Sequence, residues 1–171
     1  KVWPAALLAA AVVALRRRLV VLGAAAATSA VVLGAIAVLG GASHAFGFVA
    51  GQTARGLQIE APVSGWFLWQ VVTGSADAAI VYDRDILTFQ VQGPGVDAVS
   101  AAMTPLLVLV AGAVVILGAV KMWRGASFAA LFPPFSLALV LTLIVVNKVG
   151  SPQFLAWLIA PLVLWLVVDR R

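Results

Sequence analysis

Residues 55–60, with the sequence RGLQIE just before Pro62, combine a cation, an amide and a carboxylate. The guanidinium of Arg55 carries a planar fork of N–H donors that matches the oxygens of a lipid phosphate. If this stretch is helical, Gln58 lies on the same side as Arg55, and Glu60 lies about 140° around the helix. The alternative is an ordinary interfacial arginine that snorkels or pairs with a nearby carboxylate.

Residues 147–153, with the sequence NKVGSPQ, form a second polar group. Ser151 followed by Pro152 is typical of a helix start, with the serine as N-cap and the proline at the first helical position. The free N–H groups and the positive dipole end of such a helix, beside Lys148, would form an anion site. A capped turn with an interfacial lysine is the alternative.

Asp83-Arg84-Asp85 is formally an Asp-x-Asp motif, which holds a divalent metal and sugar-nucleotide phosphates in soluble-type glycosyltransferases. No α/β nucleotide domain is predicted around it, and the motif falls where a hairpin turn is expected. We therefore predict turn chemistry and no metal site. The single histidine, His44, is predicted to be a loop residue, with a phosphate contact as the alternative.

The amino-acid composition indicates whether the segments that position these polar groups lie in water or in lipid. Apolar residues make up 64% of the chain and charged residues 10%, against about 45–50% and 25% in soluble domains. One soluble core of this length could not hide so much apolar surface, so lipid must solvate much of it. The chain has no cysteine, which excludes disulfides and thiolate metal sites. Its basic residues flank apolar runs, a membrane pattern that argues against nucleic acid as a partner.

Five apolar segments predict an all-α, polytopic bundle of integral membrane helices; they are residues 3–15, 19–39, 104–120, 127–146 and 153–168. The second is long enough to cross a hydrocarbon core that needs about 20 helical residues, whereas the first is too short. Because the chain also opens without methionine, we expect residues 1–171 to be one membrane domain, the C-terminal part of a larger protein. No apolar segment carries a charge in its middle, which counts against a pump or coupled carrier.

The basic residues set the predicted orientation, because cytoplasmic loops are enriched in lysine and arginine. Seven of the eleven basic residues fall on the cytoplasmic side if the segments alternate in direction: Arg16, Arg17, Arg18, Lys121, Arg124, Arg170 and Arg171. Residues 40–103 then form one long loop on the extracytoplasmic face of the plasma membrane.

This loop is predicted to contain three kinds of structure. Residues 46–59 are predicted to be helical, with Gln52, Arg55 and Gln58 on one side. Residues 63–72 contain the aromatic cluster Trp66, Phe67 and Trp69 and are predicted to be interfacial or re-entrant. Alternating residues at 87–92 predict a strand that pairs with 79–82 in a hairpin.

Prolines inside the last two apolar segments predict kinks at Pro133-Pro134 and at Pro161. A simple packing kink is the favoured explanation. The alternative is that the kinks splay the outer ends of these helices and so line a cavity.

Two stretches also resemble a known family. RGLQIEA at residues 55–61 and NKVGSPQFLAWLIAPL at residues 147–162 look like the C-terminal half of the GT-C polytopic membrane glycosyltransferases. They are most similar to glycosyltransferase family 87, the actinobacterial mannosyltransferases that use polyprenyl-phosphate mannose. Ala61 replaces a serine of the family motif, and Phe154 occupies an aromatic position. The resemblance covers about two dozen residues.

The resemblance implies an inverting enzyme that moves a sugar, mannose in the family, from a polyprenyl-phosphate donor to an envelope glycan or glycolipid acceptor. It implies that Arg55 and Lys148 bind the donor phosphate, and that Gln58, Ser151 and Gln153 shape the pocket. The family's general base lies in its first extracytoplasmic loop, expected upstream of Lys1, which leaves Glu60 a supporting role. No cofactor beyond the lipid-linked donor is implied. The competing hypothesis is a non-catalytic polytopic protein: a lipid or solute transporter, or a structural subunit of an envelope complex.

Overall fold

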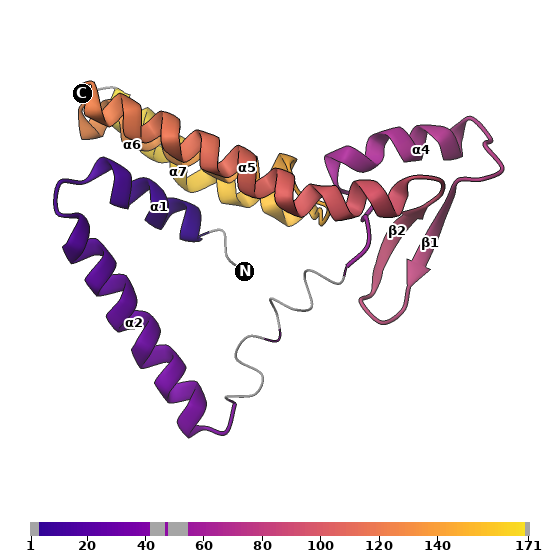
Figure 1. The fold of residues 1–171 in the computed structure, drawn as a ribbon, viewed down its shortest axis with the longest axis horizontal. Helices are drawn as coiled ribbons and strands as arrows, with labels where there is room; N and C mark the ends of the chain where they lie inside the picture. Colours follow the sequence, from indigo (N-terminus) through magenta and orange to yellow (C-terminus); the bar gives the residue numbers. More distant parts are fainter. Residues whose placement is uncertain (1–3, 42–46, 48–54, 170–171) are drawn as a thin grey trace.

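The computed structural model describes residues 4–41, 47 and 55–169, and in these ranges the chain is mainly a bundle of antiparallel helices. Three helices of the described part are long and apolar enough to cross a membrane: α2 (Arg18–Val38), α5 (Val96–Trp123) and α6 (Phe128–Val145). Two shorter apolar stretches pack with them: α1 (Pro4–Ala14), and the 3-10 helix η3 (Pro152–Leu158) that continues into α7 (Ile159–Asp169). Figure 1 shows α1, α5, α6 and α7 side by side.

The core of the bundle forms where α1 lies against α6. Ala6, Ala10 and Ala14 are buried and recur every fourth residue, so they form one face of α1. Small side chains let two helix backbones approach closely, which favours association where lipid surrounds the helices. The alanine face contacts larger residues of α6, namely Leu131, Phe135, Leu139 and Val140.

A second close contact joins α5 to α6 at Gly118, which is buried against the ring of Phe135. A Cβ atom at position 118 would lie 2.6 Å from Cζ of Phe135. The ring thus occupies the space that any other residue at position 118 would fill.

Helix α2 differs from the other helices because it diverges from the bundle after the turn at residues 15–17 (Figure 1). None of its residues is buried. Its large apolar side chains, such as Leu19, Val31 and Val38, are exposed and suit a lipid environment.

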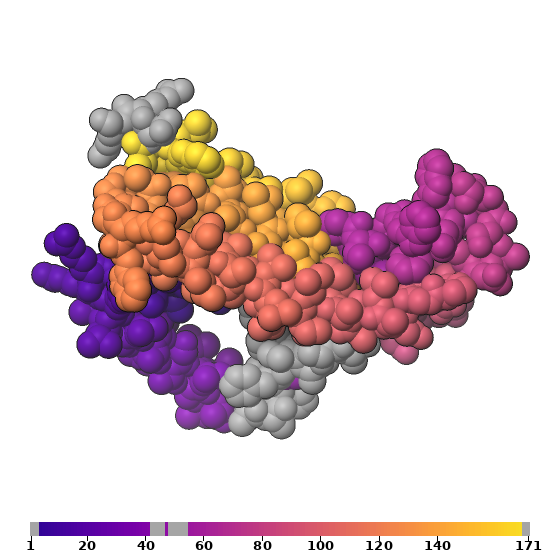
Figure 2. Space-filling model, turned by 45° about the horizontal axis from the view of Figure 1, so that its top comes forward, coloured from indigo at the N-terminus to yellow at the C-terminus, as the bar shows by residue number. Residues whose placement is uncertain are grey.

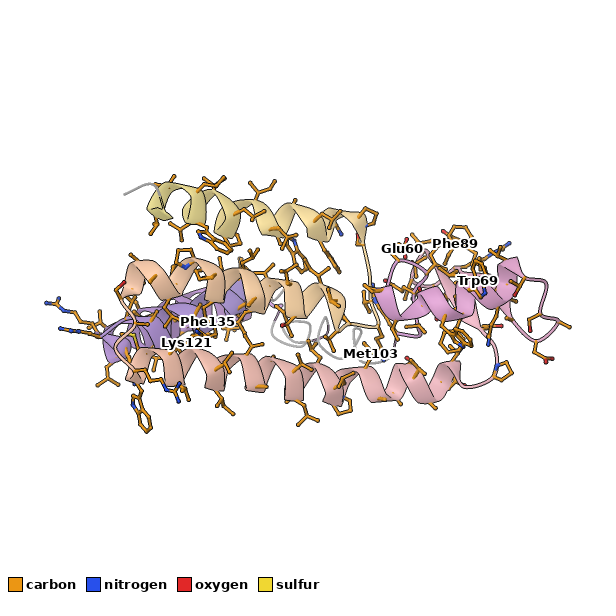
Figure 3. All side chains as sticks on the ribbon, turned by 90° about the horizontal axis from the view of Figure 1, so that it is seen from above. Glu60, Trp69, Phe89, Met103, Lys121 and Phe135 are labelled. Atoms are coloured by element: carbon orange, nitrogen blue, oxygen red, sulfur yellow. The ribbon has the colours of Figure 1, made fainter. Side chains whose placement is uncertain are left out.

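The bundle has two chemically different ends. At one end, here named the basic end, lie the α1–α2 turn with Arg16 and Arg17, and the α5–α6 turn at residues 124–127 (Figure 1). At the other, named the hairpin end, lie α4 and the β-strands. Figure 3 shows Lys121 toward the basic end, and Glu60, Trp69 and Phe89 together at the hairpin end.

The hairpin end is built from the short helices η2 (Pro62–Ser64) and α4 (Gly65–Val72) and an antiparallel pair, β1 (Ala79–Asp83) and β2 (Thr88–Gln92). Ile80 pairs with Val91 and Tyr82 with Phe89, so these four side chains share one face of the hairpin. A small core forms on this side from Leu57, Ala61, Phe67, Val91 and Val96. The core includes the first residue of α5 and so joins the hairpin to the bundle.

The predicted helix over residues 46–59 is wrong from residue 55 onward, although residue 47 is helical. Residues 55–57 are not helical, and Gln58 forms an antiparallel bridge with Gln90 of β2. The backbone groups of this stretch bond to other segments, so they do not form helical i to i−4 bonds. Residues 46 and 48–54, including Gln52, lie outside the described residues.

The proline predictions also need correction. Pro133 and Pro134 do lie inside α6, and Pro105 lies inside α5. Pro161, however, lies in the first turn of α7, directly after η3. A first-turn residue needs no α-helical acceptor for its N–H, so Pro161 starts an α-helix and does not kink one.

We predict that Gly118→Leu destabilises the bundle by about 1–3 kcal/mol, because the new side chain must displace the buried Phe135 ring. The measurement is the thermal unfolding midpoint of the purified protein in detergent. Gly112→Leu on the same helix is the control, since nothing lies within 4 Å of a Cβ at that position. Equal midpoints for the two variants would contradict the predicted packing.

Candidate functional site

The stretch 55–61, here named the strap, lies between β2 and the α6–η3 turn, residues 146–151. On one side, Ile59 N–H donates to the carbonyl of Phe89 (3.2 Å), and the strap's Leu57 carbonyl accepts from Val91 N–H (3.0 Å). On the other side, Gln58 N–H donates to the carbonyl of Lys148 (3.0 Å). The structure therefore brings together the two sequence motifs, which are far apart along the chain.

Two glycines make this close approach feasible. A Cβ atom at Gly150 would collide with the backbone carbonyl of Glu60 and lie 2.5 Å from the nitrogen of Ala61. A Cβ atom at Gly56 would collide with Oε1 of Gln90. The collision at position 150 is with backbone atoms, which cannot move aside as the side chain of Gln90 can. The contact therefore requires a residue without a side chain at position 150.

Ser64 fixes the far end of the strap. Its hydroxyl is fully buried and lies within donating distance of the carbonyls of Ile59 (2.7 Å) and Ala61 (2.6 Å). Its own N–H donates to the Ala61 carbonyl (2.9 Å). We did not single out Ser64 from the sequence. Ser64 lies two residues after Pro62, and serine hydroxyls commonly bond to backbone carbonyls three or four residues earlier in the chain, which is the available signal.

The two predicted phosphate ligands occupy half-buried or buried positions near this contact. Nε of Arg55 is buried and makes no hydrogen bond within the part of the chain that is described. A buried N–H without an acceptor is uncommon and costs free energy, so an acceptor from a ligand would relieve that cost. Lys148 is only 8% exposed, although it lies in a turn.

Gln58 and Glu60 lie differently from the helical expectation. Gln58 is 3% exposed and belongs to the extended strap, so it does not share a helix face with Arg55. Glu60 is exposed and lies at the hairpin end near Phe89 and Trp69 in the view of Figure 3. Its carboxylate is therefore accessible to an incoming molecule.

Ser151 is the N-cap residue of a helix and Pro152 is its first residue, as predicted, but this helix is the 3-10 helix η3. Ser151 precedes η3 in an extended conformation and its side chain makes no cap hydrogen bond. Its carbonyl instead accepts from Phe154 N–H (2.9 Å), the tighter pattern of a 3-10 helix. The N-terminus beside Lys148 therefore belongs to a seven-residue 3-10 helix and not to an α-helix. Gln153 is exposed, and the rings of Phe154 and Trp157 stack at 4.1 Å.

Asp83 of the Asp-x-Asp motif organises the hairpin turn. Its Oδ1 accepts from the N–H groups of Asp85 (2.9 Å) and Ile86 (3.3 Å). Its Oδ2 accepts from Nε2 of Gln90 (2.8 Å), and so connects the turn to the residue that faces the strap. The other loop candidate, His44, lies outside the described residues.

A cavity of about 250 Å³ opens beside the strap. Its lining comes from the strap, from β2 and from the start of α5: Gly56, Leu57, Gln90, Val91, Gln92, Gly93, Val96 and Asp97. The lining offers amides and one carboxylate, which are suited to hydroxyl groups. Figure 2 shows the hairpin end, which contributes Gln90, Val91 and Gln92 to this lining, projecting from the helices as a lobe.

No family model, no curated protein and no solved structure matches this chain. The class of the protein therefore follows from its own features: helices long and apolar enough to cross a membrane, with polar groups gathered at the hairpin end. The glycosyltransferase resemblance of the two motifs stays a prediction.

We predict that Gly150→Ala weakens the contact between the strap and the α6–η3 turn, because the methyl group meets the backbone of Glu60. The expected cost is about 1–3 kcal/mol. The measurement is amide hydrogen exchange at residues 57–61, which should become faster. Gly65→Ala is the control because its Cβ meets open space. Unchanged exchange in Gly150→Ala would show that this close approach does not hold the strap.

Proposed function

We propose that this protein is a membrane glycosyltransferase that moves a sugar, mannose in the family it resembles, from a polyprenyl-phosphate donor to an envelope glycan or glycolipid. The observation that carries the proposal is the direct contact between the strap and the α6–η3 turn. The strap is the first motif of the resemblance, and the second motif begins in the α6–η3 turn. Residues recruited for one site should converge in space, and the backbone contact of Gln58 with Lys148 supports this.

The chemistry needs a cationic pocket for a leaving phosphate. In an inverting transfer, a carboxylate removes the proton from the acceptor hydroxyl while the oxygen of that hydroxyl bonds to the anomeric carbon of the sugar. The bond between that carbon and the phosphate oxygen breaks, and the phosphate leaves with the bonding electrons. Arg55 and Lys148 stabilise the charge that develops on the phosphate. Gln58, Ser151 and Gln153 shape the pocket, and the exposed carboxylate of Glu60 assists at the acceptor side.

The proposed membrane orientation places the basic end in the cytoplasm and the hairpin end outside the plasma membrane. The five apolar segments then alternate in direction, with η3 and α7 as the last. A 3-10 helix rises about 2.0 Å per residue, so η3 and α7 together extend roughly 30 Å, the thickness of a hydrocarbon core. By the same arithmetic α5 is about 42 Å long, so its first turns stand outside the membrane beside the hairpin.

The test of the site is sugar transfer by variants of the full-length protein. We expect Arg55→Ala and Lys148→Ala to lower transfer from radiolabelled polyprenyl-phosphate mannose by at least about 100-fold, since each removes a phosphate contact of the transition state. Arg84→Ala, which removes an exposed arginine from the hairpin turn, is the charge-matched control and should keep full activity.

Membrane insertion of all three variants is checked by detergent extraction and size-exclusion chromatography. Full transfer by both site variants would refute the assigned roles. A wild-type protein that transfers no sugar from this donor would favour the non-catalytic alternative.

The orientation is tested separately by cysteine labelling. The chain has no cysteine of its own that would react in the background. Arg84→Cys at the hairpin turn should react with a membrane-impermeant maleimide in intact cells from which any outer barrier has been removed. Arg124→Cys at the basic end should react only after permeabilisation. The two variants each replace one exposed arginine, and the reverse labelling pattern would invert the proposed topology.

A further inference from the structure

The α5–α6 turn at the basic end is short and rigid. Gly125 adopts a left-handed conformation with φ +89°, and its N–H donates to the Met122 carbonyl (3.1 Å). The next N–H, of Ala126, donates to the Lys121 carbonyl (3.1 Å). These two bonds form a Schellman motif, which ends α5 at a defined residue. The position of α6 relative to the last turn of α5 is thereby fixed.

Two cations of α5 face the start of α6 across this turn. Lys121 and Arg124 are three residues apart, so they lie on the same side of the helix. They line a cavity of about 450 Å³ together with Gly125, Ala126, Ala130 and Leu131. The charged groups of this lining are both positive. Residues 98–168 contain no acidic residue, so neither α6 nor the last turns of α5 can neutralise them.

The surroundings of the cavity are those of a membrane–water boundary. Trp123 is 89% exposed, and the half-exposed ring of Phe128 stacks on Phe132 at 4.8 Å. Aromatic side chains of this kind settle at the level of the lipid headgroups. About one turn before Lys121 in α5, Ile116 and Leu117 present exposed apolar surface. A ligand that satisfies both regions must carry an anionic head and apolar chains.

We propose that this basic cavity is a binding site for the phosphate of an anionic glycerophospholipid. Lys121 and Arg124 contact the phosphate oxygens, and the acyl chains lie along the apolar surface of α5. Basic pockets between membrane helices bind such headgroups because opposite charges meet where water is partly excluded. The site lies at the opposite end of the bundle from the strap and does not depend on the proposed sugar transfer.

The experiment measures binding of phosphatidylglycerol to the detergent-purified protein by native mass spectrometry, with phosphatidylcholine as the neutral comparison. We expect Lys121→Gln/Arg124→Gln to bind phosphatidylglycerol at least about tenfold more weakly than the wild type, because both positive charges that attract the headgroup are removed. Arg16→Gln/Arg18→Gln removes the same charge from the same end, outside the cavity lining, and should retain most of the binding.

Rescue by Lys121→Arg/Arg124→Lys would support a role for charge at these positions. Equal losses in the two Gln pairs would overturn the proposal in favour of diffuse attraction to the whole basic end. Equal binding of phosphatidylcholine would also overturn it. Displacement of the lipid by millimolar inorganic phosphate alone would show that the cavity takes a free anion instead. Circular dichroism of each variant checks that the helices remain folded.

Discussion

The backbone hydrogen bond from Gln58 to Lys148 joins the two halves of the molecule. Within the described residues, the strap links β2 of the hairpin end to the turn that precedes the last two helices. The backbone of the strap forms hydrogen bonds with β2 on one side and with the α6–η3 turn on the other. These bonds satisfy the backbone polar groups of a stretch that is largely buried. Gly150 and Ser64 support this arrangement, the first by having no side chain and the second by its buried hydroxyl.

Helices long and apolar enough to cross a membrane follow a different physical rule, because lipid is as apolar as their side chains. Burial of apolar surface therefore contributes little to holding them together, and close packing contributes more. The alanine face of α1 and the contact of Gly118 with Phe135 show this rule at work. Helix α2 has no comparable face in contact with α5 or α6, and it diverges from them.

The distribution of charge separates the ends of the bundle. One end collects several cations beside exposed aromatic rings, an arrangement suited to a layer of anionic headgroups. The other end mixes cations, amides and carboxylates over a small β-structure, an arrangement suited to recognising one molecule. A protein with these two ends has a natural orientation in a bilayer, and it presents its varied polar chemistry on one side only.

The sequence by itself determined the long apolar helices, the basic clusters at their ends, and the residues that form β2. These features depend on composition and local periodicity, which are properties of neighbours along the chain. The local pattern failed at Gln58, and at Ser151 it predicted the helix start but not the type of helix. Gln58 has helical spacing from Arg55 but pairs with β2, and Ser151 has the residues of an N-cap but precedes a 3-10 helix.

Only the tertiary structure decided that the strap meets the α6–η3 turn. That contact depends on a glycine at position 150 and on backbone partners contributed by β2, all distant in sequence. Hydrogen bonds between distant segments leave no periodic signal, because a backbone N–H can pair with any carbonyl that the fold brings near.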